Sequence, residues 1–229
     1  MGVQTDKISV LISVFNGEKT LLDSVKTITS QTHKNLEILI MDDGSTDNTF
    51  EMCKSLEKLD SRIKVYKNNN NIGLTKSLNI LIEHSTGSYI ARHDIDDFSS
   101  LDRLEIQLKY LLINKLDLVY AKAKIINSSR ILPGLSYYFP KKFLIKFKNP
   151  FIHGTLLAKK ETLISVGKYD ERFTYSQDYK LAYDLLKSGS RIKILGKSLY
   201  NLNMENNISN NYKTQQKYFA DCVRKNKNP

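Results

Sequence analysis

The chain has 229 residues, of which 35 are basic and 24 acidic, so its formal net charge is +11. A hydrophobic fraction of 41% with 10 Gly and 4 Pro is typical of a globular protein and excludes a disordered or collagen-like chain. No apolar run approaches the roughly 18–20 residues of a membrane span. Cys53 and Cys222 are too few for a disulfide framework or a CxxC metal site and fit a reducing compartment. The first residues lack a basic-then-apolar signal, so we expect a cytoplasmic location.

Short apolar runs alternate with helical patterns through the first 121 residues. We expect buried strands at 8–14, 36–41, 63–66, 88–93 and 116–121. Apolar residues recur at helical spacing in 21–28, 50–56, 74–81 and 101–111, the last with Ser99 or Ser100 as its N-cap. This alternation predicts right-handed βαβ units and therefore an α/β fold with a mostly parallel sheet flanked by helices. Further strands at 155–158 and 192–195 and a helix at 178–188 follow, and no linker divides the chain.

The positive charge is concentrated in two segments. Residues 134–150 and 212–229 each carry a net +4, which together is +8 of the +11. The basic residues are Lys141, Lys142, Lys146 and Lys148 in the first segment, and Lys213, Lys217, Arg224, Lys225 and Lys227 in the second. Because a nucleic-acid binder more often spreads its basic stripe over the folded domain, we do not expect a nucleic-acid partner.

Two acidic clusters follow the ends of predicted strands. Asp42 and Asp43 come directly after the second strand, and Asp94, Asp96 and Asp97 come after the fourth. Each cluster alone is compatible with a turn or a helix cap. In an open α/β sheet, however, ligands bind at the carboxyl ends of the strands, and crowded carboxylates require a cation or donors. If the chain is extended there, Asp94 and Asp96 share a face and Asp97 points away, which predicts a Mg2+ or Mn2+ site for a diphosphate.

The loop after the first strand also faces this edge. Its sequence, SVFNG from Ser13 to Gly17, leads into a helix, so its backbone N–H groups can face a ligand. It lacks the glycines of GxGxxG and the GK[ST] of a P-loop. This argues against a nicotinamide dinucleotide and against the usual nucleotide triphosphatase.

The chain resembles the bacterial family 2 glycosyltransferases, which have the GT-A fold. The resemblance rests on an ordered set of segments that covers residues 7 to about 195. These are VLISVFNGEKT with LEILIMDDGSTDNT, NIGLTKSLN, GSYIARHDIDD with DRLEIQL, NPFIHGTLLAKKE, and GKYDERFTYSQDYKLAYDLLKSG. The resemblance implies one GT-A domain, which we place at 1–205. Residues 1–121 would bind the nucleotide sugar, 122–205 would carry the acceptor-binding and catalytic half, and 206–229 would be a basic tail.

The resemblance also implies roles for individual residues. Ser13, Phe15 and Asn16 would line the nucleotide-base pocket, and Asp43 would contact the base. In the family's DxD element, Asp96 would hold Mn2+ or Mg2+ and Asp94 would bind ribose or a water on the metal, with Asp97 as an auxiliary. Asp178 would be the catalytic base. His153 lies near the donor diphosphate in relatives, although a structural role is equally compatible with the sequence, as is a helix cap for Asp178.

Three departures from the family pattern bear on activity. Gln177 stands where relatives have a Glu before the catalytic Asp. Asn201 stands where many relatives have an Arg, so a contact to phosphate is lost, and Lys76 could replace it. The Gln-x-x-Arg-Trp motif of processive synthases is absent and the chain has no Trp, which favours transfer of a single sugar.

We therefore expect a metal-dependent, inverting glycosyltransferase. It would move a hexose or hexosamine from a nucleotide sugar, most simply a UDP-sugar, to a glycan or lipid-linked acceptor. The products would belong to lipopolysaccharide, capsule or another surface polysaccharide. Two alternatives remain open at this stage: a catalytically impaired sugar-nucleotide binder, and a receiver-like signalling module, which Asp42 and Asp43 superficially resemble.

The first basic segment suggests contact with a membrane. If Pro140 starts a helix, Phe143 and Phe147 lie one turn apart beside Leu144, with lysines on the flanks. Such a segment can lie in the headgroup region of an anionic bilayer. We expect peripheral attachment to the cytoplasmic face of the inner membrane, and a core helix with a solvated basic face is the alternative.

Overall fold

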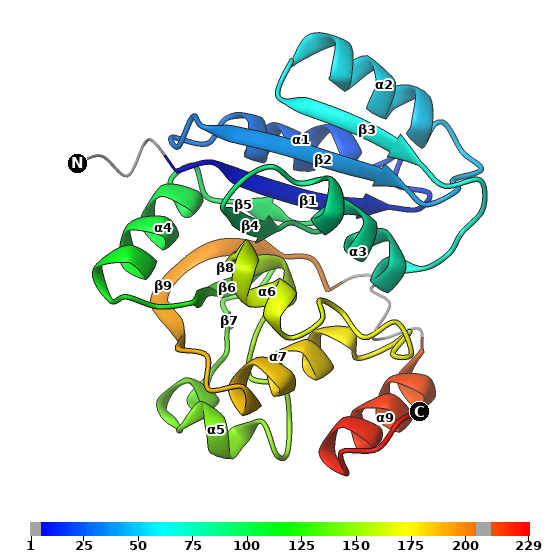
Figure 1. Cartoon of the computed structure of the whole chain (residues 1–229). Coiled ribbons are helices and arrows are strands. Elements are labelled where there is room, and N and C mark those ends of the chain that lie inside the picture. Colours follow the sequence, from blue (N-terminus) through cyan, green and yellow to red (C-terminus); the bar gives the residue numbers. More distant parts are fainter. Residues whose placement is uncertain (1–5, 205–211) are drawn as a thin grey trace.

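Four parallel strands form the first half of the central sheet. The computed structural model describes residues 6–204 and 212–229. Val10 pairs with Ile38 on one side and Ala91 on the other, and all three are completely buried. The strands run in the order β3-β2-β1-β4 (Figure 1). β2 and β3 are added on one side of β1 and β4 on the other, so the order of the strands reverses beside β1. Their bounds are Ile8–Val14 for β1, Leu36–Asp42 for β2, Ile63–Lys67 for β3 and Tyr89–Arg92 for β4.

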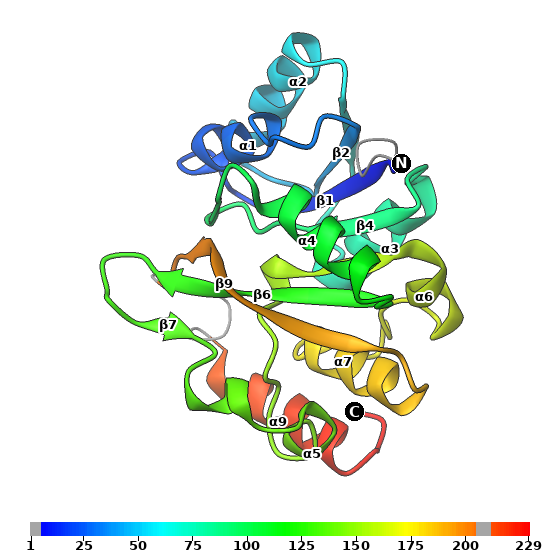
Figure 2. The same ribbon diagram turned by 90° about the vertical axis from the view of Figure 1, so that its left-hand side faces the viewer.

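The second half of the sheet is mixed. The short strand β8 (Leu157–Lys159) lies between β4 and β6 (Leu118–Ile125) and is antiparallel to both. β6 therefore runs in the same direction as β4, as the sequence predicts, but does not touch it. β9 (Ile192–Leu202) pairs with β6 in parallel and continues past the predicted 192–195, as Figure 2 shows. Two short strands complete the sheet: β5 (Phe98–Ser99) on β9 and β7 (Ile131–Leu132) on β6.

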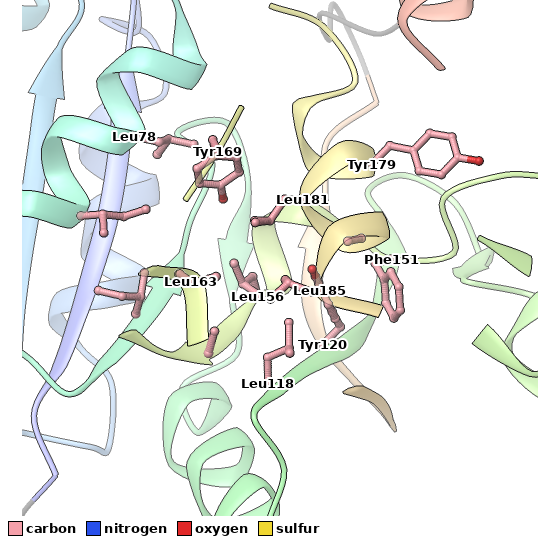
Figure 3. Packing of buried hydrophobic residues seen from close by; sticks show 14 of the residues in the cluster. Leu78, Leu118, Tyr120, Phe151, Leu156, Leu163, Tyr169, Tyr179, Leu181 and Leu185 are labelled. Carbon is pink, nitrogen blue, oxygen red and sulfur yellow. The ribbon is translucent and has the colours of Figure 1, made fainter. Parts of the chain in front are cut away.

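Helices cover both faces of the sheet and enclose two apolar clusters. One cluster joins the sheet to α1, α2 and α4, and the other joins it to α3, α6, α7 and α9. Figure 3 shows the second cluster, in which Tyr169 lies between Leu78 of α3 and Leu181 of α7. The helices are α1 (Leu21–Thr29), α2 (Thr49–Leu59), α3 (Leu74–His84), α4 (Arg103–Ile113), α5 (Lys141–Leu144), α6 (Lys160–Ser165), α7 (Gln177–Lys187) and α9 (Lys213–Arg224), with 3-10 turns η1 (Leu135–Tyr138) and η2 (His153–Thr155).

The expected N-cap of the helix at 101–111 is wrong. Asp102 precedes α4, and its side chain makes no capping hydrogen bond. Ser99 lies in β5, and its hydroxyl hydrogen-bonds the ring of buried His93 at 3.2 Å, so it is engaged away from the helix. The cap was misplaced because no local pattern indicates the short strand β5.

A buried carboxylate stabilises the amino-terminal edge of the parallel strands. Glu37 accepts hydrogen bonds from Ser9, from the backbone N–H of Gly87 and from the Thr86 hydroxyl, and it forms an ion pair with Lys7 at 3.0 Å. Burial alone would raise the pKa of Glu37, but these donors outweigh it and lower the pKa to about 2. The carboxylate of Glu37 is therefore fully paired within the protein.

The last described segment packs on the domain. α9 contacts α7, Phe219 lies edge-on to Phe173, and Val223 is 1% exposed. The predicted boundary of the basic tail, between 205 and 206, lies outside the described residues, so the division into 1–205 and 206–229 stays a prediction. Within 6–204 and 212–229, no helix is both long and apolar enough to cross a bilayer.

Candidate active site

The loops after β1 and β2 are locked together at the carboxyl edge of the sheet. Asn16 adopts a left-handed backbone conformation (φ 51°) and its Oδ1 accepts the backbone N–H of Thr46 at 2.9 Å. Its own N–H donates to the Ser45 hydroxyl at 2.9 Å. Asn16 therefore fixes the loop, whereas the ring of Phe15 is 48% exposed and can stack on a planar ligand. Ser13, at the end of β1, is half-buried beside them.

Asp43 organises the loop that leads into α3. Its Oδ1 accepts hydrogen bonds from the Asn68 amide (2.8 Å) and the Ile72 N–H (3.0 Å), and its Oδ2 accepts from the Gly73 N–H (2.9 Å). The side chain is buried, so it acts first as a fixed part of the pocket wall. Lys76 lies in the first turn of α3 and is exposed, which leaves its ammonium group available at the same edge.

The acidic residues after β4 form a tight turn rather than an extended segment. The Asp97 N–H donates to the Asp94 carbonyl at 3.2 Å, which closes the turn. The alternation assumed for 94–97 is therefore wrong, although the expected divergence of the side chains is present. Asp94 and Asp96 are half-buried, while Asp97 is 1% exposed and accepts the Asn203 N–H at 2.7 Å.

Burial and the crowding of carboxylates raise the pKa values of Asp96 and Asp97 in this turn. Burial and the neighbouring Asp94 raise the pKa of Asp96, and burial with the charge of Asp94 raises that of Asp97 to about 8. A divalent cation would relieve this repulsion. No group of three or more His, Cys, Asp or Glu suited to a metal was found in the described part of the chain. Mg2+ and Mn2+ take few carboxylates and complete their shells with phosphate and water, so this donor set fits them.

Two buried arginines, Arg92 and Arg103, pack against the acidic turn, and neither was predicted from the sequence. Arg92 is 2% exposed and donates to Asp94 Oδ1 at 2.5 Å and to the Leu11 carbonyl at 2.9 Å. Arg103, completely buried, donates to the Gly154 carbonyl at 2.9 Å and to the Arg92 carbonyl at 3.2 Å. Both arginines lie in segments already noted, IARHDIDD and DRLEIQL, which is the signal that could have found them.

Tyr200 joins the turn to the last strand of the sheet. Its hydroxyl accepts the Asp94 N–H at 3.1 Å, and its ring lies 5.3 Å from the Arg103 guanidinium. Tyr200 directly precedes Asn201 in β9, so the last strand reaches the acidic turn through this tyrosine. Burial raises the pKa of Tyr200 well above its usual value, and the hydroxyl stays neutral.

Asp178 and His153 come from the second half of the chain. Asp178 is in the first turn of α7, and its Oδ2 accepts the Asn149 amide at 2.7 Å. The ring of His153 hydrogen-bonds the Tyr169 hydroxyl at 2.7 Å, and burial lowers the pKa of this histidine. The charges of Asp94 and Asp178 both act on His153 and on Tyr169. The two acids therefore both act on the same hydrogen-bonded pair of rings.

The structure thus brings most of the predicted residues to one edge of the sheet. Ser13, Phe15, Asn16 and Asp43 come from the β1 and β2 loops, and Asp94 and Asp96 come from the β4 turn. Asp178 and His153 approach from the second half of the chain. Gln177, adjacent to Asp178, is 8% exposed and leaves the acid without a neighbouring carboxylate in its own turn.

Comparison with known proteins identifies the family. Residues 9–182 match the family model described as Glycosyl transferase family 2. The chain belongs to glycosyl transferase family 2. The resemblance drawn from the sequence is confirmed, and a receiver-like module is excluded. The protein is a glycosyltransferase related to enzymes of O-antigen and polysaccharide biosynthesis.

Two Escherichia coli relatives carry informative names. The O-antigen biosynthesis glycosyltransferase WbnJ is 34% identical over 195 residues, which are 82% of this chain and 75% of WbnJ. The enzyme named UDP-Glc:alpha-D-GlcNAc-diphosphoundecaprenol beta-1,3-glucosyltransferase WfgD is 30% identical over 185 residues, covering 80% of this chain and 71% of WfgD.

Solved structures confirm the GT-A fold. Staphylococcus aureus TarS 1-349 with UDP-GlcNAc has a TM-score of 0.76 at 20% identity. The match covers 88% of this chain but only 59% of that one. The mannosyltransferase PcManGT from Pyrobaculum calidifontis, with GDP-Man and Mn2+, has a TM-score of 0.77 at 18% identity and covers 98% of this chain and 66% of its own.

Proposed function

We propose that the protein transfers one sugar, with inversion, from a nucleotide-diphosphate sugar to a hydroxyl of a glycan or lipid-linked acceptor in bacterial surface polysaccharide, lipopolysaccharide or capsule synthesis. The observation that carries the proposal is the meeting of the β1 and β2 loops, the acidic turn at 94–97 and the start of α7 at one sheet edge. The names of WfgD and WbnJ support a UDP-sugar donor and a polysaccharide product.

The donor would bind across the β1–β4 switch point. Phe15 would stack on the base, Asp43 and Ser13 would form the polar wall of the base pocket, and Asn16 would hold the loop in place. Lys76 would supply a positive charge to the diphosphate, because an exposed ammonium at a helix start attracts phosphate oxygens. His153, neutral at neutral pH because burial lowers its pKa, would act as a hydrogen-bond donor rather than a cation.

Asp96 and Asp94 would hold Mn2+ or Mg2+. When bound, the cation neutralises charge that develops on the leaving diphosphate. Asp94 shares one oxygen with Arg92, which leaves Oδ2 for the ligand. The mannosyltransferase neighbour solved with Mn2+ supports this choice of metal.

Asp178 would remove the proton of the acceptor hydroxyl as the new bond forms. A positioned carboxylate contributes about 10²–10⁴ in rate. Asn149 donates to Oδ2 and leaves Oδ1 of Asp178 for the acceptor. One base and one displacement invert the configuration at the anomeric carbon.

A catalytically impaired sugar-nucleotide binder is the second candidate, because Asn201 and Gln177 replace charged residues of relatives. The two are separated by incubating the protein with Mn2+ and a panel of nucleotide sugars. Release of the nucleoside diphosphate supports the enzyme, whereas binding with no release over hours supports the binder.

We also propose attachment to an anionic membrane face through the first basic segment. Phe143 and Phe147 are 56% and 58% exposed, with ring centroids 5.1 Å apart, while Leu144 is buried beneath them. Lys141 donates to the carbonyl oxygens of Tyr137 and Phe139, so it fixes the segment and does not face lipid. The exposed ammonium groups of this segment belong to Lys142, Lys146 and Lys148.

Co-sedimentation with phosphatidylglycerol vesicles tests the attachment. Each basic residue near an anionic surface contributes about 1 kcal/mol, so changing the three exposed lysines to Gln should weaken binding by about 100-fold. Binding should also fall steeply with salt. Unchanged binding by the triple variant, or no binding at low salt, would contradict the assignment.

A further inference from the structure

A hollow lies directly beside the residue that holds Asp178. It has a volume of about 400 Å³ and runs between residues 130–136 and residues 148–152. Asn149 forms part of its wall, and the same side chain donates through Nδ2 to Asp178 at 2.7 Å. Asn149 Oδ1 accepts the Phe151 N–H at 3.0 Å, which fixes the orientation of the amide. The hollow is therefore one side chain away from the proposed base.

The wall of the hollow is apolar with two positive charges. Leu132, Pro133 and Phe151 supply the apolar part, and Arg130 and Lys148 supply the cations. No Asp or Glu occurs among the lining residues of the described chain. Within residues 6–204 and 212–229, neither cationic head group has a hydrogen-bond or ion-pair partner in the protein. Such a wall recognises an anion that is attached to an apolar or sugar group.

The two cations come from separate elements of the fold. The Arg130 carbonyl accepts the Ile125 N–H at 2.9 Å, closing the hairpin of β6 and β7. The Lys148 N–H donates to the Leu144 carbonyl at 2.9 Å, at the end of the turn that follows α5. The two cationic residues therefore belong to the two segments that line the hollow, 130–136 and 148–152, and both can contact one anionic group inside it.

We propose that this hollow binds the phosphate or diphosphate stem of the acceptor, with Arg130 and Lys148 on the phosphate oxygens. The inference rests on the proposed function and adds the acceptor's chemical class and its subsite. The acceptor hydroxyl would meet Asp178, while the stem would lie behind Asn149. The donor diphosphate belongs to the acidic turn at 94–97, so the two anionic groups have separate places. The exposed rings of Phe143 and Phe147 precede Lys148 in the same segment. A lipid chain attached to the stem would leave the protein along these rings.

Isothermal titration with octyl diphosphate tests the subsite. The donor site is first saturated with UDP and Mg2+, so that the probe cannot enter it. A charge-assisted contact is worth at least about tenfold in affinity, so Arg130→Gln with Lys148→Gln should weaken binding by about 100-fold. Lys109→Gln is the control, because Lys109 is an exposed lysine that does not line the hollow. It lies on α4, whose buried residues belong to the other apolar cluster. This variant should bind as the wild type does.

Two further ligands show whether the hollow requires both the phosphate and the group attached to it. Octyl glucoside, which has no phosphate, should bind weakly and equally to the wild type and the double variant. Equal binding of octyl glucoside and octyl diphosphate by the wild type, or an unchanged affinity in the double variant, would overturn the proposal. Pyrophosphate that binds as tightly as octyl diphosphate would assign the hollow to free phosphate and also overturn it. UDP binding by the wild type is measured separately, and its absence would contradict the proposed function rather than the hollow.

Discussion

Replacing Asp178 by Asn separates proton removal from every other role of this residue. Asn is nearly isosteric, and its carbonyl oxygen can still accept the Asn149 amide that now lies 2.7 Å from Oδ2. The fold and donor binding should therefore persist. Only the proton acceptor is lost, and since a positioned base contributes about 10²–10⁴, we expect turnover to fall by at least about 10².

The stability effect of the same change should be small. Asp178 lies in the first turn of α7, where a negative charge interacts favourably with the helix dipole. Loss of that charge costs about 0.3–1 kcal/mol. Thermal unfolding should thus change by only a few degrees, which keeps the kinetic comparison interpretable.

The assay is the initial rate of nucleoside diphosphate release with acceptor present. The variant should keep the donor KM and lose turnover. Asp184→Asn is the control, because Asp184 lies on the same helix and pairs only with Lys180 in the described structure. Unchanged turnover with a lowered unfolding temperature would refute the reasoning and leave Asp178 as a helix cap.

Three further changes address the turn and the sheet. Asp96→Ala should abolish transfer and the Mn2+-dependent part of UDP binding, measured by titration with and without EDTA; full turnover with Mn2+ would contradict the metal role. Gly154→Ala should weaken the same metal-dependent binding, because a Cβ there meets the Tyr200 hydroxyl at 2.4 Å and Asp94 Oδ2 at 2.9 Å. For Glu37, whose folded pKa is about 2, stability is present above pH 4.5 and is lost as pH falls toward 2. Thermal unfolding at pH 7 and pH 3 should show a smaller loss of stability at acid pH for Glu37→Gln than for the wild type. The same loss in both proteins would refute the role of Glu37.

The sequence predicts the parallel strands and their functional edge well, because both depend on local signals. Runs such as 8–14 and 36–41 are buried on both faces, and a strand of that kind is apolar at most of its positions. The acids after β4 are also local, so their place at the strand end was readable. Their turn was not, since it depends on one hydrogen bond between Asp97 and Asp94.

The supports of the site were not readable from the sequence for a different reason. Arg92 and Arg103 are charged, so a pattern of apolar residues assigns them to the surface, yet both are buried under the acidic turn. The contact between Asn149 and Asp178 joins positions 29 residues apart, and only the tertiary fold sets it. Likewise β8 enters between β4 and β6 from late in the chain, which no local pattern indicates.

We propose that the sheet edge at β1, β2 and β4 binds a nucleoside diphosphate through a cation. UDP and GDP are titrated into the wild type and Asp96→Ala, each with Mn2+ and with EDTA. We expect tight binding of one nucleotide by the wild type with Mn2+, and binding weakened to the EDTA level in the variant. Equal binding by both proteins with Mn2+, or no binding of either nucleotide by the wild type, would contradict it.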